Sequence, residues 1–224
     1  MRLGCLWLIP GFGKNAPVIG NARSILFGLI GVAGIALAGP VEDFELGAKR
    51  YRDGDMMGAM APLKTAADAG HAQAQALYGD ILDKAEMDED AIDYLTRAAA
   101  QGNADGQYGL AVMLLAGEGT ERDPARAASL LRAAARQDAR LAINALAQAY
   151  LRGDAELDAQ DAASPEGRSL ITRAAELGYL PAIDALADAF ERGAYGLTPD
   201  PAQAARWRDR ASEARRKLPA DTAS

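Results

Sequence analysis

The sequence predicts an all-α protein, an α-solenoid of about five antiparallel helix pairs. β-Branched residues are sparse beyond residue 40, which argues against a sheet. Half of the residues are hydrophobic but only 6% are aromatic, and much of the apolar content is alanine. Small side chains bury little area each, so many closely packed helices fit this composition better than one deep core.

Internal repeats are the third observation that leads to this fold class. Alanine-rich segments end similarly at 65–70, 97–102, 132–135, 173–178 and 210–213, with their alanine pairs 32 to 41 residues apart. Each of the first four is followed by a second amphipathic helix pattern, at 71–84, 103–117, 138–153 and 179–193. A helix pair that cannot bury its own apolar face stacks on similar pairs, which makes a solenoid.

Helix boundaries are marked by glycine and proline. Gly70, Gly102 and Gly178 are placed to end helices with a left-handed cap. Helix starts are predicted at three pairs of an N-cap residue followed by proline: Asp123-Pro124, Ser164-Pro165 and Asp200-Pro201. Pro62 and Pro181 are also predicted near helix starts, where a missing N–H costs least.

The third unit carries a family resemblance. It contains, in order, Gly102, Ala104, Gly106-Gln107-Tyr108, Gly117-Glu118-Gly119, Asp123, Arg126-Ala127 and Arg132-Ala133-Ala134. This pattern resembles the Sel-one-like repeat (SLR), a relative of the tetratricopeptide repeat, and the resemblance runs from about Phe44 to Lys217. It implies a right-handed α-solenoid that works as a binding adaptor. Four units depart from the pattern: Gly54-Asp55 stands in a shortened connection, Ala85-Glu86 replaces a glycine pair, Gln137-Asp138 replaces a closing glycine, and 154–167 holds an insertion.

The N-terminal segment is predicted to be a secretory signal at 1–38. An apolar run at 24–38 follows a basic leader without acids and ends in Ala36-Leu37-Ala38, a pattern that signal peptidase accepts. The run is shorter than the roughly 20 residues of a spanning helix, although an uncleaved inner-membrane anchor facing the periplasm is the alternative. We expect a periplasmic or secreted protein, with the SLR solenoid at 39–218 and a disordered tail at 219–224.

Composition and motifs argue against most kinds of chemistry. The net charge of −7 disfavours nucleic acid as a partner. Gly117 and Gly119 do not complete a dinucleotide-binding motif, because position 122 is Arg, so we interpret them as an interhelix turn with positive φ. His71, the only histidine, is interpreted as a helix-cap or turn residue, and the acidic residues at 80–93 as a solvated helix face. No catalytic residue, cofactor or metal site is expected.

The first helix of each pair is predicted to line a partner-binding groove. Residues at i, i+4, i+7 spacing on one face are Asp80, Asp83, Tyr108, Val112, Leu115, Asn144, Gln148, Leu151, Asp184, Asp188 and Glu191. The alternative is that Tyr108 and its neighbours pack between repeats. At 206–217 a basic helix end is a candidate contact for an anionic envelope polymer.

We therefore expect a non-enzymatic scaffold or adaptor of the bacterial cell envelope, which binds a protein or peptide partner whose identity the sequence does not give. One alternative is an envelope glycan hydrolase that uses paired carboxylates, since Asp and Glu are the only abundant acid–base groups. The other is an adaptor anchored in the inner membrane by the N-terminal segment.

Overall fold

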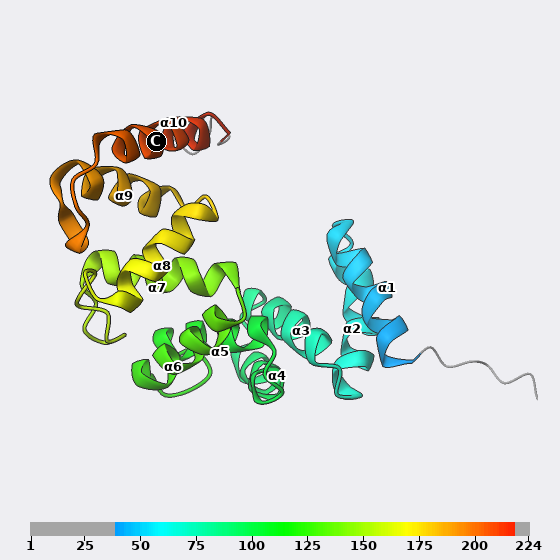
Figure 1. The fold of residues 1–224 in the computed structure, drawn as a ribbon. Helices are drawn as coiled ribbons and strands as arrows, with labels where there is room; N and C mark the ends of the chain where they lie inside the picture. Colours follow the sequence, from blue (N-terminus) through cyan, green and yellow to red (C-terminus); the bar gives the residue numbers. More distant parts are fainter. Residues whose placement is uncertain (1–38, 218–224) are drawn as a thin grey trace, which may run out of the picture. The chain divides into compact units, whose positions relative to one another are not determined.

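The computed structural model describes residues 39–217, and this part of the chain folds into ten α-helices and one short 3-10 turn (Figure 1). These are α1 (Pro40–Arg52), α2 (Met56–Asp68), α3 (Ala72–Lys84), α4 (Asp88–Ala100), α5 (Ala104–Ala116), α6 (Pro124–Arg136), α7 (Arg140–Arg152), α8 (Pro165–Glu176), α9 (Leu180–Arg192), η1 (Ala194–Gly196) and α10 (Pro201–Lys217). The only β-pairing within 39–217 is one bridge between Asp154 and Ala159, so the predicted all-α class is confirmed. The predicted signal at 1–38 and tail at 219–224 lie outside the described residues.

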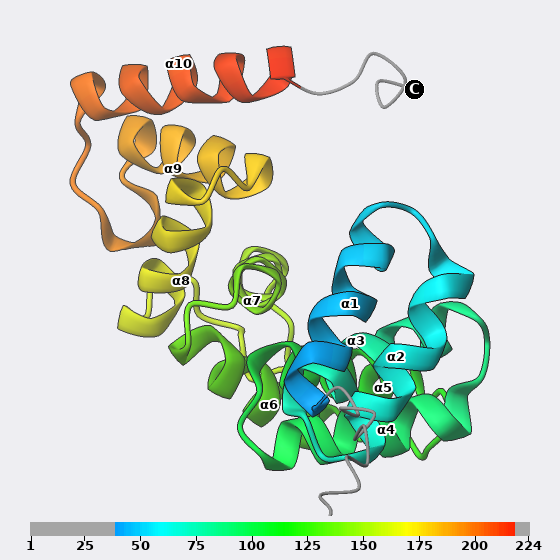
Figure 2. The same ribbon diagram turned by 90° about the vertical axis from the view of Figure 1, so that its right-hand side faces the viewer.

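The helices form five stacked pairs, as predicted. Helix α1 packs on α2, α3 on α4, α5 on α6, α7 on α8 and α9 on α10 (Figures 1 and 2). The second helix of each pair also packs against the first helix of the next: α2 on α3, α4 on α5, α6 on α7, and α8 on α9. In addition, the first helices α1, α3 and α5 contact one another in succession, and this places three equivalent faces side by side.

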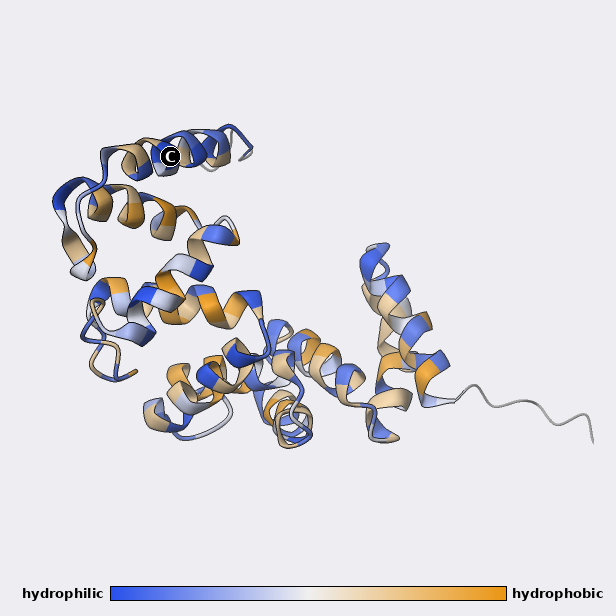
Figure 3. Cartoon of the chain, in the orientation of Figure 1, coloured by the Kyte–Doolittle hydropathy of each residue, from blue (hydrophilic) through white to orange (hydrophobic). Residues whose placement is uncertain are grey.

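Small residues let these helices approach closely. The repeated alanine pairs contribute side chains with no exposed surface, namely Ala66, Ala98, Ala134 and Ala174. A Cβ added at Gly47 would lie 2.6 Å from the Leu63 side chain, and one added at Gly79 would lie 2.8 Å from that of Leu95. The first helix thus seats a leucine of the second helix against its backbone. Hydrophobic and hydrophilic residues alternate along most helices, whereas α10 is mostly hydrophilic (Figure 3).

The predicted helix boundaries are largely confirmed. Asp123 accepts a hydrogen bond from the Arg126 backbone N–H at 2.9 Å, and Ser164 accepts one from Gly167 at 3.0 Å. The closing glycines adopt left-handed φ values of +91°, +79° and +89° at Gly70, Gly102 and Gly178. Pro181 is the second residue of α9, where no helical partner is lost.

The prediction that Pro62 lies near a helix start is wrong. Helix α2 begins at Met56, and Pro62 lies inside it. Because proline has no N–H, the Gly58 carbonyl has lost its usual helical donor. Instead, Arg50 on α1 donates a hydrogen bond from Nη1 to the Gly58 oxygen at 2.8 Å. A neighbouring helix therefore supplies the missing donor, which the local pattern around Pro62 could not indicate.

Candidate functional site

A groove of about 630 Å³ opens along the first helices of the first three pairs. Helices α1, α3 and α5 provide most of its surface, and α4 and α7 add one residue each. The lining residues are Phe44, Ala48, Tyr51, Arg52, Gln73, Ala76, Leu77, Asp80, Asp83, Lys84, Leu95, Asp105, Tyr108, Gly109, Val112 and Leu141. The groove is therefore an apolar surface with charged residues among its lining.

The depression in this groove comes from the alternation of small and large side chains. Ala48, Ala76 and Gly109 line it from three successive first helices. Tyr51 and Tyr108 are large aromatic residues that line it from α1 and α5. A surface depression of about 630 Å³ is large enough to accept a side chain of another molecule.

The structure brings part of the predicted site together in this groove. Asp80 and Asp83 on α3 line it with Tyr108 and Val112 on α5. Tyr108 is also partly buried against the core, so it both packs and lines the groove. Burial raises the pKa of its phenol.

Other predicted residues lie along α7. Gln148 lines a second pocket of about 180 Å³ between α5 and α7, together with Leu115 and with Tyr108 and Val112, which line both. Leu151 is partly buried and packs against the core. The buried Oδ1 of Asn144 has no hydrogen-bond partner within 39–217.

The predicted acidic residues of α9 are engaged in ion pairs and line neither pocket. Asp184 pairs with Arg215 of α10 at 2.6 Å, and Asp188 pairs with Arg192 at 2.8 Å. Glu191 pairs with Arg208 of α10. The last helix thus covers part of the face that corresponds to the groove in the earlier pairs.

The same contacts involve much of the basic segment at 206–217. Arg208 and Arg215 pair with α9, as described above, and Lys217 pairs with Glu213 at 2.7 Å. Arg210 donates to the Glu176 backbone carbonyl at the end of α8. These partners neutralise part of the charge that an anionic polymer would use, so a polymer contact there stays a prediction.

Charged groups in the groove differ in how they are paired. Lys84 Nζ lies 2.6 Å from Asp80 Oδ2 and 3.4 Å from the Tyr51 hydroxyl, and the hydrogen bond to Asp80 raises the pKa of Lys84. Asp83 has no basic partner in the described part of the chain. Burial, helped by the nearby carboxylates of Asp80 and Asp88, raises the pKa of Asp83.

Sequence reasoning missed the contribution of α1 and the rim residue on α7. Phe44, Tyr51 and Arg52 line the groove from α1, and Leu141, which is 56% exposed, lines it from α7. The spacing of Phe44, Ala48 and Tyr51 at i, i+4 and i+7 was the available signal. Phe44 stacks on His71 with ring centroids 4.6 Å apart.

His71 has the predicted cap role. Its Nδ1 accepts a hydrogen bond from the Ala74 backbone N–H at 3.2 Å and caps α3. Both Gly117 and Gly119 have positive φ, +79° and +64°, as expected of an interhelix turn. No group of His, Cys, Asp and Glu side chains within 39–217 has the arrangement of a metal site.

Comparison with known proteins identifies the repeat. The Sel1 repeat family model matches residues 72–103, 104–138, 140–179 and 181–214, which together make up more than half of the chain. The chain belongs to the Sel1 repeat family. The matches cover the pairs from α3 to α10, and α1 with α2 forms a further pair before them. Proteins with Sel1 repeats are generally protein-interaction scaffolds.

Solved structures show the same fold. A protective antigen of uropathogenic Escherichia coli strains with an SLR fold is 27% identical, with a TM-score of 0.66, over 78% of this chain and 38% of that one. The chain thus spans less than half of the length of that antigen. A Sel1 repeat protein from Oxalobacter formigenes is 24% identical, with a TM-score of 0.65, over 78% of this chain and 73% of its own.

A third solved Sel1 repeat protein, from Klebsiella pneumoniae, is 22% identical, with a TM-score of 0.54, over 78% of this chain and 86% of its own. No curated protein matches the chain. None of the helices in residues 39–217 combines the length and the apolar character needed to cross a membrane.

Proposed function

We propose that this Sel1 repeat protein is a non-enzymatic scaffold of the bacterial cell envelope that binds a segment of a partner protein in the groove of α1, α3 and α5. The observation that carries the proposal is the groove itself, a depression along the first helices of three consecutive pairs. The general role of Sel1 repeats in protein interaction supports it.

Exposed apolar side chains in the groove give a partner something to bury. Val112 is 38% exposed and Leu141 is 56% exposed, although both are large aliphatic residues. Covering such side chains contributes about 25 cal/mol for each Å² of apolar surface removed from water. Bound side chains that enter between Ala48, Ala76 and Gly109 would bury further surface.

A charged residue in the groove should abolish partner binding. We predict that Val112→Asp reduces capture of the native partner at least about tenfold, because an unpaired carboxylate would be buried in the interface. Leu177→Asp is the matched control, since Leu177 is 39% exposed but lies outside the groove. Affinity capture from the native host, quantified by mass spectrometry, compares the two variants.

Both variants must keep the helicity of the native chain in far-UV circular dichroism. The proposal requires that Leu177→Asp keeps the partner while Val112→Asp loses it. If both variants retain the partner, the groove is not the docking surface.

Export is the second part of the proposal. The basic, acid-free leader and the apolar run that ends in Ala36-Leu37-Ala38 support cleavage after Ala38. We predict that the chain purified from its host begins at Gly39, and N-terminal sequencing measures this directly. An intact leader in the purified protein would instead support the membrane-anchored adaptor.

The glycan hydrolase is the second candidate, because burial raises the pKa of Asp83 in the groove, which is the direction that a general acid needs. Asp80 and Asp83, however, lie three residues apart on one helix face, and Lys84 already pairs with Asp80. Glycosidases place their two carboxyl groups on opposite sides of the scissile bond. The arrangement of Asp80 and Asp83 therefore favours the scaffold over the hydrolase.

A further inference from the structure

Carboxylates without basic partners gather next to the groove. Asp80 pairs with Lys84, and Asp93 pairs with Arg97. From 83 to 90, five acidic residues form no ion pair within residues 39–217, namely Asp83, Glu86, Asp88, Glu89 and Asp90. The last four line a recess of about 510 Å³ together with Met87 and Gly119.

This acidic recess adjoins the groove. Asp83 lines the groove in the last turn of α3, and the recess begins at Glu86, three residues further along in the turn before α4. Asp105, at the start of α5, also lines the groove; it is exposed and has no basic partner among the described residues.

The basic side chains of the groove do not balance these acids. Lys84 is held by Asp80, and Arg52 on α1 is the other basic residue of the lining. Asp83 and Asp105 together with the recess therefore leave an excess of negative charge beside an apolar depression. A negatively charged surface speeds the encounter with a positively charged partner and disfavours binding of a negatively charged one.

We propose that the groove accepts a basic, amphipathic segment of the partner protein. One large apolar side chain of this segment enters the depression between α1, α3 and α5, and Lys or Arg side chains beside it meet Asp83, Asp105 and the acidic recess. The inference rests on the proposed function and gives the chemistry of its ligand. An acidic segment would meet these carboxylates without compensation.

The test uses three amidated, fluorescently labelled peptides of equal length that share leucine at the same helical positions. The remaining positions are all lysine, all glutamine or all glutamate. Fluorescence anisotropy at low salt measures binding to the purified chain. We expect the lysine peptide to bind, the glutamine peptide to bind at least about tenfold more weakly, and the glutamate peptide not to bind.

A matched pair of charge variants separates the groove from general attraction to an acidic protein. The double variant Asp83→Asn with Asp105→Asn should weaken binding of the lysine peptide by about fivefold or more. The control, Glu176→Gln with Asp209→Asn, makes the same change in net charge at exposed positions outside both the groove and the recess. It should leave the affinity within about twofold.

Several outcomes would overturn the inference. Equal binding of the lysine and glutamine peptides would leave the groove as a docking surface but remove the requirement for basic residues. If the two double variants weaken binding of the lysine peptide equally, the binding depends on the net charge of the protein and not on the groove. No binding of the lysine peptide at about 1 mM would also overturn it.

A second copy of the chain is the competing occupant. Sedimentation velocity at the protein concentrations of the binding assay distinguishes the two cases. We expect a monomer that binds the lysine peptide. A dimer that dissociates when Val112 is replaced by Asp, and that excludes the peptide, would overturn the inference. The proposed function itself is tested separately by affinity capture, and it fails if the Val112→Asp variant still captures the native partner.

Discussion

Gly117 and Gly119 lie in the same turn, but the surrounding structure restricts substitution at the two positions to different degrees. Both lie in the turn before α6 and both have positive φ. A Cβ at Gly117 would meet its nearest neighbour, Arg122 Cβ, at 3.5 Å, which is an ordinary contact. A Cβ at Gly119 would lie 2.5 Å from the backbone oxygen of Asp88, at the start of α4. Gly119 is therefore required by a close approach between two segments as well as by its backbone conformation.

These two positions give a matched pair of alanine variants. We predict that Gly117→Ala costs about 1 kcal/mol of unfolding free energy, because an L-residue is disfavoured in the left-handed region. Gly119→Ala should cost about 2–4 kcal/mol, because the Asp88 backbone must also move. Urea unfolding followed by circular dichroism measures both. Equal costs would mean that α4 yields easily at this point.

Other left-handed positions lack glycine altogether. Glu86 and Asp138 stand where the repeat pattern loses its glycines, yet their φ values are +60° and +62°. The backbone thus keeps the turn at a local cost of about 1–2 kcal/mol for each residue. At Gln137-Asp138 the departure seen in the sequence is therefore a change of residue type and not of turn conformation. At Ala85-Glu86 the turn itself differs, because Ala85 has φ −92° where Gly117 has +79°, and only 85–87 join α3 to α4.

At the scale of the elements, most helix boundaries could be predicted and the contacts between helices could not. Asp123-Pro124 and Ser164-Pro165 act on neighbouring N–H groups, so their effect can be deduced from local sequence. The donor that Arg50 supplies to α2 joins two helices, and no local pattern indicates it. For the same reason, only part of the groove could be predicted. The residues that α3 and α5 contribute follow from helical periodicity, whereas Leu141 lines the groove only because α7 packs beside it.

Glutamine side chains form one such contact at two junctions. Gln101 Nε2 donates to the Gly70 carbonyl at 3.1 Å and to Gln75 Oε1 at 2.7 Å. Gln137 Nε2 repeats this with Gly102 at 2.9 Å and Gln107 at 2.9 Å. Each glutamine at the end of a second helix is thereby tied to the turn that closes the preceding pair. In sequence these residues read only as polar helix ends.

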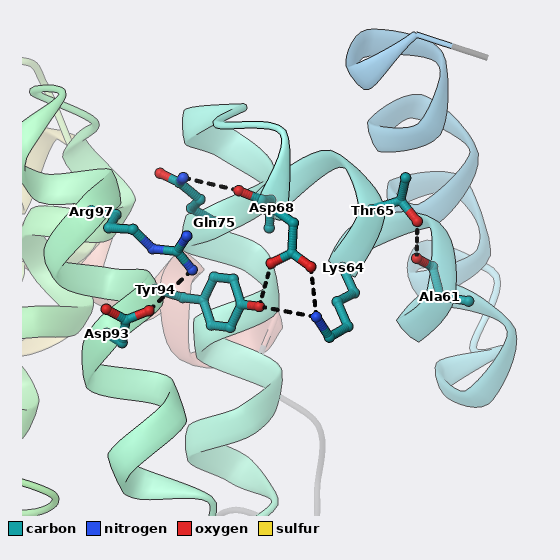
Figure 4. Close-up of polar contacts among 9 residues, drawn as sticks. Ala61, Lys64, Thr65, Asp68, Gln75, Asp93, Tyr94 and Arg97 are labelled. Atoms are coloured by element: carbon teal, nitrogen blue, oxygen red, sulfur yellow. Dashed lines mark hydrogen bonds and ion pairs between the residues drawn. The ribbon is translucent and has the colours of Figure 1, made fainter. Parts of the chain in front are cut away.

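On the scale of the whole molecule, stability is built from neighbouring pairs. Helix α2 is held to the next pair by two groups of polar contacts (Figure 4). Tyr94 of α4 donates to Asp68 at 2.6 Å, and Lys64 donates to the same carboxylate at 2.6 Å. The hydrogen bonds from Lys64 and Tyr94 lower the pKa of Asp68. Their stabilising effect is therefore present above the unfolded-state pKa and is lost as pH falls through the lower folded-state value.

The second group of contacts centres on Gln75, which is 2% exposed and donates to the Ala67 carbonyl of α2 at 3.0 Å. Because α1 and α2 form the first described pair, only one junction in this part of the chain holds them. The same pair carries Phe44 and Tyr51, so one wall of the groove depends on this junction. In a solenoid, a weakened junction acts mainly on the pair beyond it.

Replacing Gln75 by Leu should therefore loosen the first pair selectively. The variant loses the hydrogen bonds to Ala67 and Gln101, worth about 1–2 kcal/mol together, and amide exchange in residues 40–68 should rise roughly tenfold. Gln107→Leu is the comparison variant, because it removes the hydrogen bond from Gln137 within an interior pair that has a neighbouring pair on each side. Hydrogen exchange with mass spectrometry should then show faster exchange in α1 and α2 only for Gln75→Leu. A uniform rise from α1 to α10 would mean that the pairs open together, and the groove wall would then be as stable as the rest of the solenoid.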